Sequence, residues 1–134
     1  MRKASWGEKK VRLEYEPHGI VLHADKDRIG QIVSNLVINA AKFTEEGAIT
    51  VTTSVEEASK TMLLSVQDTG TGIHPDIVPR LFSKFATKSM KGTGLGLFIA
   101  KSIAEAHGGT IVASNNEGKG ATFTLRLPLQ GEMI

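Results

Sequence analysis

The sequence predicts a single domain of the α/β class, in which strands and helices alternate along the chain. Two segments carry apolar residues at the spacing of one helix face, and several shorter segments alternate apolar and polar residues as half-buried strands do. The 134 residues are the length of one domain, and 40% hydrophobic residues suffice for an ordinary core. We therefore expect residues 11–130 to form the domain, residues 1–10 to be an extension or the end of an upstream segment, and residues 131–134 to be a tail.

The N-terminal part is predicted to be a hairpin followed by a helix. Val11 to Glu16 alternates apolar and polar residues, and Pro17-His18-Gly19 turns it into a second strand, Ile20 to His23. Asp25 is a good N-cap for a helix that runs to about Phe43. The inward face of this helix is defined by residues at helical spacing: Ile29, Ile32, Val33, Leu36, Val37 and Ala40.

The rest of the chain alternates further strands and helices. Glu45-Glu46-Gly47 ends the first long helix, and the strands Ala48 to Val55 and Thr61 to Gln67 follow. Because the second strand ends at Asp68, that carboxylate is expected at a strand tip, half-buried. The remaining predicted elements are a short helix Pro75 to Val78, a helical turn Pro79 to Phe85, a mobile linker Ala86 to Gly92, a helix Leu95 to His107 closed by Gly108-Gly109, and a hairpin of Thr110 to Ser114 with Ala121 to Leu129.

Composition excludes several classes of function. Lys and Arg exceed Asp and Glu by only two, with the signs interspersed, which argues against nucleic acid as a partner. The chain has no Cys, and its four His, at positions 18, 23, 74 and 107, lack the spacing of metal ligands. No apolar run has membrane-spanning length and no secretory signal opens the chain, so we expect a cytoplasmic domain without direct membrane contact.

One polar stripe on the first long helix indicates a ligand. Gln31, Asn35, Asn39 and Lys42 lie three or four residues apart and so share a face. A solvated face is the alternative, but the stretch from Ser34 to Ala41 is apolar for an exposed surface, and Asn is a poor interior helix former. The amide oxygen of Asn39 suits magnesium, and Lys42, one turn on, can reach phosphate.

The first glycine-rich loop, Asp68-Thr69-Gly70-Thr71-Gly72-Ile73, is interpreted as the site of a purine base. A half-buried Asp68 carboxylate needs a donor, and the amino group of adenine can supply one. Gly70 and Gly72 leave room for a flat base and permit a positive φ. The alternative, a simple β-turn with an N-cap, loses weight because a second glycine-rich loop follows.

That second loop, Gly92-Thr93-Gly94-Leu95-Gly96-Leu97, opens a helix, where free N–H groups and the helix dipole favour phosphate. It lacks the third Gly of the dinucleotide-binding fingerprint and the Gly-Lys-Ser/Thr ending of the Walker loop. Lys84, Lys88 and Lys91 can neutralise phosphates or simply face solvent. Phe82 and Phe85 are interpreted as core or hinge residues.

Taken in order, these motifs resemble the ATP-binding catalytic domain of two-component sensor histidine kinases, within the superfamily shared with gyrase, the ninety-kilodalton heat-shock chaperones and the mismatch-repair ATPases. The match runs from about Val11 to Leu129. It is carried by an asparagine box (Asn35-Leu36-x-x-Asn39-Ala40-x-Lys42-Phe43), a first glycine box (Asp68-x-Gly70-x-Gly72-Ile73), a phenylalanine box (Leu81-Phe82-x-x-Phe85), a second glycine box (Gly92 to Leu97), and the closing His107-Gly108-Gly109 and Gly118-x-Gly120-x-Thr122-Phe123.

The resemblance implies a two-layer α/β sandwich: a mixed, mostly antiparallel five-stranded sheet with three helices on one face, and a flexible ATP lid between Ile73 and Thr93. It also implies magnesium on Asn39, adenine on Asp68, Thr122 near the base, and Asn35, Asn39 and Lys42 as the catalytic group. Residues and resemblance together place ATP contacts at Asn39, Lys42, Asp68, Gly70, Gly72, Ile73, Lys88, Gly92, Thr93, Gly94, Leu95, Gly96, Leu97 and Thr122.

One departure within the superfamily bears on the activity. Hydrolytic relatives carry a Glu four residues before the magnesium Asn, as general base for water, and this chain has Asn35 there. Phosphoryl transfer to a neutral imidazole needs no such base, so the resemblance implies transfer to a His on an upstream dimerisation domain and, indirectly, signalling to a response regulator. Two alternatives stay open at this point: a nucleotide-switched binding module of the anti-sigma factor kinase type, and a hydrolytic clamp ATPase.

Overall fold

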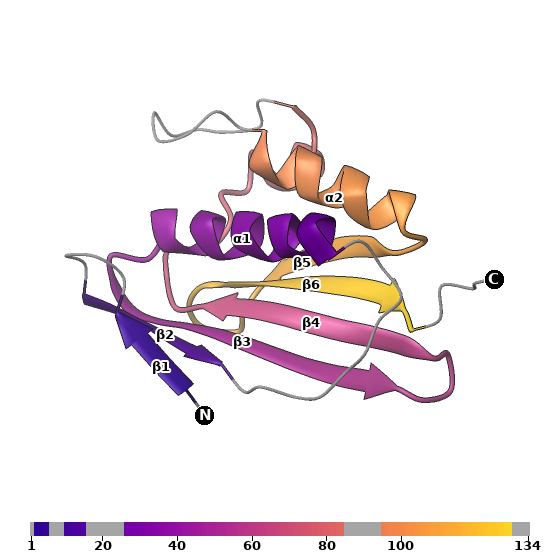
Figure 1. Cartoon of the computed structure of the whole chain (residues 1–134). Helices are drawn as coiled ribbons and strands as arrows, with labels where there is room; N and C mark the ends of the chain where they lie inside the picture. The colour runs from indigo at the N-terminus through magenta and orange to yellow at the C-terminus, as the bar shows by residue number, and fades with distance from the viewer. Residues whose placement is uncertain (1, 6–9, 16–25, 85–94, 130–134) are drawn as a thin grey trace.

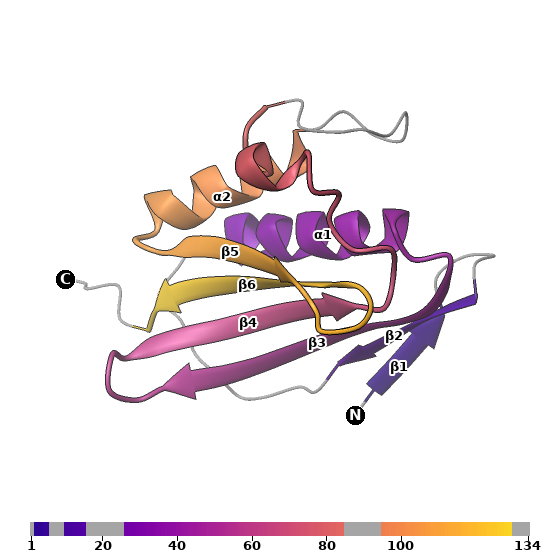
Figure 2. The same ribbon diagram turned by 180° about the vertical axis from the view of Figure 1, so that it is seen from behind.

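The structure is a computed structural model that describes residues 2–5, 10–15, 26–84 and 95–129. These residues form two layers, a six-stranded sheet and a pair of α-helices that cover one of its faces (Figures 1 and 2). The elements are β1 (Arg2–Ser5), β2 (Lys10–Tyr15), α1 (Lys26–Lys42), β3 (Glu46–Glu56), β4 (Thr61–Asp68), a short 3-10 helix η1 (Val78–Arg80), α2 (Gly96–Ala106), β5 (Thr110–Asn115) and β6 (Ala121–Pro128).

The sheet is mixed and mostly antiparallel, as expected. The strand order is β1-β2-β3-β4-β6-β5, and β2 with β3 is the parallel pair among the described strands. Asp68 at the end of β4 pairs with Ile49, and Gln67 pairs with Thr122 of β6. The β4 strand therefore lies in the interior of the sheet and delivers Asp68 at its tip.

The expected numbers of strands and helices were wrong. The described residues form six strands because Arg2–Ser5 pairs antiparallel with β2, where we expected only an extension. The hairpin partner predicted at residues 20–23 lies outside the described residues. The expected third helix is reduced to the 3-10 turn η1, because Pro79 sits in its first turn and disfavours the α conformation at the preceding Val78.

The core lies between the helices and the sheet. Burial alternates along β4 and β6, so that one face of each strand meets the helices and the other is partly exposed. Phe82, after η1, packs on this core with its ring edge-on to Phe123, the centroids 6.3 Å apart, which confirms its interpretation as a core residue. The residues that are almost fully buried include Ile32, Leu36, Ala40, Ile49, Met62, Val66, Ala100, Ala104, Ile111, Phe123, Leu125 and Leu127.

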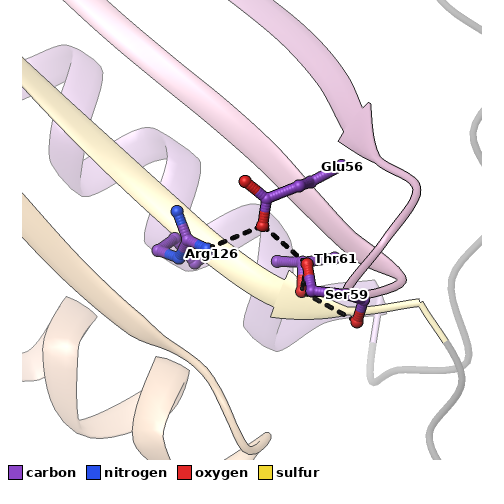
Figure 3. Close-up of polar contacts among 4 residues, drawn as sticks. All are labelled: Glu56, Ser59, Thr61 and Arg126. Atoms are coloured by element: carbon purple, nitrogen blue, oxygen red, sulfur yellow. Dashed lines mark hydrogen bonds and ion pairs between the residues drawn. The ribbon is translucent and has the colours of Figure 1, made fainter.

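A polar cluster joins β3, β4 and β6 at the end of β4 opposite Asp68 (Figure 3). Oε1 of Glu56 accepts hydrogen bonds from Ser59 Oγ at 2.6 Å and from Arg126 Nη2 at 3.2 Å. The hydrogen bond from Ser59, followed by the charge of Arg126, lowers the pKa of the exposed Glu56. This cluster joins the β3–β4 turn to β6. It lies at the end of β4 opposite the one where the candidate site is found.

Candidate functional site

Three segments meet at the Asp68 end of the sheet: the C-terminal half of α1, the loop of residues 68–73, and the start of α2. The loop is attached to the residue that follows α1, because the Thr71 N–H donates to the carbonyl of Phe43 at 3.1 Å. The side-chain amide of Asn35 in α1 donates to the carbonyl of Gly96, the first residue of α2, at 3.1 Å. Both glycine-rich segments therefore contact α1 or the residue that follows it.

Asp68 is a buried carboxylate whose two oxygens differ in their hydrogen bonding within the described residues. The residue is 3% exposed, and its Oδ1 accepts from the N–H of Gly70 at 2.9 Å and of Ala121 at 3.3 Å. Among the described residues we find no donor to Oδ2. Burial raises the pKa of Asp68 above its ordinary value, and the two backbone hydrogen bonds partly oppose that shift. A buried acceptor of this kind gains from a ligand that donates a hydrogen bond.

The loop uses most of its own backbone donors. For the N–H of Gly72 we find no acceptor among the described residues, and its φ of +81° suits glycine. Within the described residues, the Gly72 N–H without an acceptor thus lies four positions after Asp68, whose Oδ2 has no donor there. The other amides are taken in turn: Thr69 by Ala48 O at 3.2 Å, Gly70 by Asp68 Oδ1 at 2.9 Å, Thr71 by Phe43 O at 3.1 Å, and Ile73 by Asn115 Oδ1 at 2.7 Å.

Two glycines of the site are required by close backbone packing. A Cβ on Gly70 would lie 2.0 Å from the carbonyl oxygen of Phe43, and a Cβ on Gly120 would lie 1.9 Å from that of Asp68. Gly70 therefore gives room to the end of α1. That it also gives room to a base stays a prediction.

The polar stripe of α1 divides into groups with and without partners. Gln31 accepts from Arg28 at 3.3 Å, and Asn35 is committed to Gly96. The half-buried amide of Asn39 has no hydrogen-bond partner among the described residues, and Lys42 is partly exposed in the last turn. An amide oxygen without a partner fits a Mg²⁺ ligand, because Mg²⁺ takes few protein oxygens and completes its shell with water and phosphate.

The start of α2 is the described part of the second glycine-rich loop, whose role as a phosphate site stays a prediction. Its N-cap is Leu95, whose side chain makes no cap hydrogen bond to the N–H groups of the first turn. Gly96 and Leu97 are half-buried there. Lys84 has its Nζ 5.1 Å from the centre of the Phe98 ring. The predicted contacts Lys88, Gly92, Thr93 and Gly94, together with Phe85 and Lys91, lie outside the described residues.

Thr122 is not brought to the carboxylate of Asp68. Its neighbours in β6, Ala121 and Phe123, are both buried, so Thr122 belongs to the opposite face of the strand, and its hydroxyl donates to Oδ1 of Asn116. The group that contacts Asp68 is the backbone N–H of Ala121. The expectation that Thr122 lies near a base stays a prediction.

Sequence reasoning missed two residues, Asn115 and Asn116, which contact both ends of the loop. Asn116 Nδ2 donates to the carbonyl of Asp68 at 3.0 Å, and Asn115 bonds both the N–H and the carbonyl of Ile73. Two consecutive Asn where a strand ends and a turn begins are ordinary turn composition, so the sequence carried no signal for this role.

Two kinds of feature are absent from the described part of the chain. No group of three or more His, Cys, Asp or Glu side chains is placed to hold a metal ion there. No helix of the described segments is long and apolar enough to cross a bilayer.

Comparison with known proteins places this geometry in a family. Residues 24–131 match the family described as histidine kinase-, DNA gyrase B-, and HSP90-like ATPase. The chain belongs to this family. Within it, the chain is a catalytic domain of the sensor histidine kinase type, because the similar curated proteins and solved structures below are of that type.

Sensor histidine kinase WalK of Bacillus subtilis is 39% identical over 120 residues, 84% of this chain and 20% of WalK. Sensor protein SrrB of Staphylococcus aureus is 42% identical over 110 residues, 78% of this chain and 19% of SrrB. The chain thus spans about a fifth of the length of these relatives.

Solved structures of histidine kinases are similar to this chain as well. Full-length ShkA in complex with AMPPNP superposes with a TM-score of 0.78 at 35% identity, covering 90% of this chain and 26% of ShkA. The nucleotide-free catalytic domain of histidine kinase ThkA gives 0.77 at 35% identity, covering 90% of this chain and 78% of that one. These relatives do not favour the anti-sigma factor kinase alternative.

Proposed function

We propose that the chain binds Mg-ATP and presents its γ-phosphate to a histidine on a separate dimerisation domain, in two-component signalling. The observation that carries this proposal is the buried Asp68, whose Oδ2 has no donor among the described residues. The AMPPNP complex of ShkA, a structure 35% identical to this chain, supports the choice of nucleotide.

Asp68 Oδ2 and the Gly72 N–H, which have no partner among the described residues, suit adenine. The edge of adenine offers an amino donor beside a ring-nitrogen acceptor, which complements Asp68 Oδ2 and the Gly72 N–H. Guanine carries an oxygen in place of the amino group, so it would set an acceptor against the Asp68 carboxylate. Such a site selects adenine over guanine because bound guanine would leave a buried polar group without a hydrogen-bond partner.

The α1 residues suit the triphosphate and its metal. Asn39 would supply an amide oxygen to Mg²⁺, and Lys42 would reach the phosphate oxygens from the next turn. When bound, Mg²⁺ neutralises negative charge on the phosphates. The N–H groups at the start of α2 would contact phosphate from the other side.

Asn35 favours transfer over hydrolysis. An amide cannot accept a proton from water, and in the structure its Nδ2 is committed to the carbonyl of Gly96. Its role is then to hold α1 against the start of α2. A neutral imidazole is already nucleophilic, so this domain need only position the nucleotide and neutralise its charge. The acceptor histidine, the response regulator, a cytoplasmic location and the boundaries at residues 11 and 130 belong to the same proposal.

The test is transfer in trans. The chain is mixed with a separately purified dimerisation domain of a sensor kinase and with ATP labelled at the γ-phosphate. We expect acid-labile label on a histidine of the dimerisation domain and little on the chain itself. Release of free phosphate without labelled acceptor, or stable label on a His of this chain, would overturn the proposal.

Asn39→Ala is expected to remove the benefit of magnesium. Loss of even an outer-shell partner costs metal affinity by about tenfold or more, so ATP binding with Mg²⁺ should weaken at least that much. Binding with EDTA should change little. The matched control is Ser34→Ala, an exposed position on the same helix. The assignment fails if Mg²⁺ improves ATP binding by Asn39→Ala as much as it does for the wild type.

A further inference from the structure

Asn115, the last residue of β5, and Asn116, the first residue after it, hold the first glycine-rich loop at both of its ends. At the start, Asn116 Nδ2 donates to the carbonyl of Asp68 at 3.0 Å and to that of Lys119 at 3.1 Å. At the end, Asn115 Oδ1 accepts from the Ile73 N–H at 2.7 Å, while its Nδ2 donates to the Ile73 carbonyl at 3.3 Å. One side-chain amide therefore satisfies both backbone groups of one residue.

Gly72 lies between two peptide groups whose orientations are fixed from outside the loop. The N–H before it, on Thr71, is bound by the Phe43 carbonyl, and the N–H after it, on Ile73, is bound by Asn115. Asn115 also lies directly against Gly72, since a Cβ there would meet Asn115 Oδ1 at 2.9 Å. The direction of the unused Gly72 N–H is thus set by Phe43 on one side and by Asn115 on the other.

We propose that Asn115 is a positioning residue for purine recognition. It acts through Ile73 and Gly72 by fixing the Gly72 donor relative to the Asp68 acceptor. This inference rests on the proposed ATP-binding function and names a specificity-determining residue outside the asparagine, glycine and phenylalanine boxes. Asn115 is itself exposed, so removing its amide should alter the loop far more than the stability of the fold.

The experiment compares Asn115→Ala with two matched variants of the whole chain. Ser114→Ala is the control, because Ser114 is exposed, immediately precedes Asn115 in β5, and lies on the other face of that strand. Asn115→Asp is the rescue variant, because a carboxylate retains the acceptor for the Ile73 N–H. Calorimetry measures the affinity for AMPPNP, for the matching guanine analogue and for inorganic tripolyphosphate, all with Mg²⁺, and thermal unfolding is recorded without ligand.

For Asn115→Ala we expect AMPPNP to bind about fivefold more weakly, because the variant loses positioning equivalent to the net contribution of one hydrogen bond. The preference for adenine over guanine should fall by a similar factor, while tripolyphosphate affinity and unliganded Tm stay close to wild type. Asn115→Asp should recover much of the adenine preference, and Ser114→Ala should match the wild type.

Two results would overturn the inference. The first is an unchanged adenine preference in Asn115→Ala. The second is an equal loss for all three ligands together with a lowered Tm, which a merely structural residue would give. Failure of the proposed function itself looks different, because then the wild type would bind no AMPPNP at all.

Discussion

Asp68→Asn should lose ATP affinity on the order of a hundredfold or more and keep a native fold. The asparagine oxygen can still accept from the N–H groups of Gly70 and Ala121, which now bond to Oδ1. In place of Oδ2 it presents an NH₂ group, which opposes the amino group of adenine, donor against donor. Calorimetry with AMPPNP measures the loss, and circular dichroism checks the fold. Unchanged affinity would refute the assignment of the base to this carboxylate.

The same variant makes a prediction about pH. Burial raises the pKa of Asp68 in the folded state above its ordinary value of 3.8, so the protonated form favours folding. That contribution is fully present below pH 3.8 and is lost as the pH rises through the folded-state pKa. Asn does not titrate, so Asp68→Asn should be at least as stable as the wild type at pH 7. Urea midpoints should show this advantage shrinking as the pH is lowered toward 4. A variant much less stable at pH 7 would contradict the sign.

Gly70→Ala should be the most destabilising of these substitutions. Its Cβ would lie 2.0 Å from the Phe43 carbonyl oxygen, and both groups are backbone, so the loop or the end of α1 must move. The shift would also break the hydrogen bond from Thr71 to Phe43. We expect a loss of about 3 kcal/mol in the free energy of unfolding, the upper range for overpacking.

Gly30→Ala is the matched control for that substitution. Gly30 lies in α1, is exposed, and a Cβ there meets no atom within 4 Å. The change should stabilise the fold by about 0.5–1 kcal/mol, because Ala is a better helix former than Gly. Urea unfolding measures both variants. Equal stability of the two would show that the contact between Gly70 and Phe43 is not as close as described.

The sequence predicted the elements whose burial is periodic. Helix α1 and strands β4 and β6 begin and end within a few residues of their predicted bounds, because Leu36, Val66 and Leu125 belong to clear periodic patterns. Strand β1 was missed because Arg2–Ser5 has no such pattern and forms by backbone pairing to β2. The third helix was overpredicted because the local effect of Pro79 outweighed the helical spacing.

The candidate site could be predicted from the sequence where it depends on the chemistry of side chains. That Asp68 lies at a strand tip and that Asn39 lies on the polar stripe of α1 follow from residue type and position. What the sequence could not show is how backbone groups pair across the fold. That Gly70 accommodates Phe43, that Ala121 rather than Thr122 faces Asp68, and that Asn115 holds Ile73 depend on strand register and loop packing.

The most direct test of the central claim is calorimetry of the wild-type chain with AMPPNP and saturating Mg²⁺, paired with thermal unfolding. We expect binding at one site per chain, a raised Tm at saturating ligand, and much weaker binding of the guanine analogue. No heat of binding and no shift in Tm, or equal affinity for both purines, would contradict it.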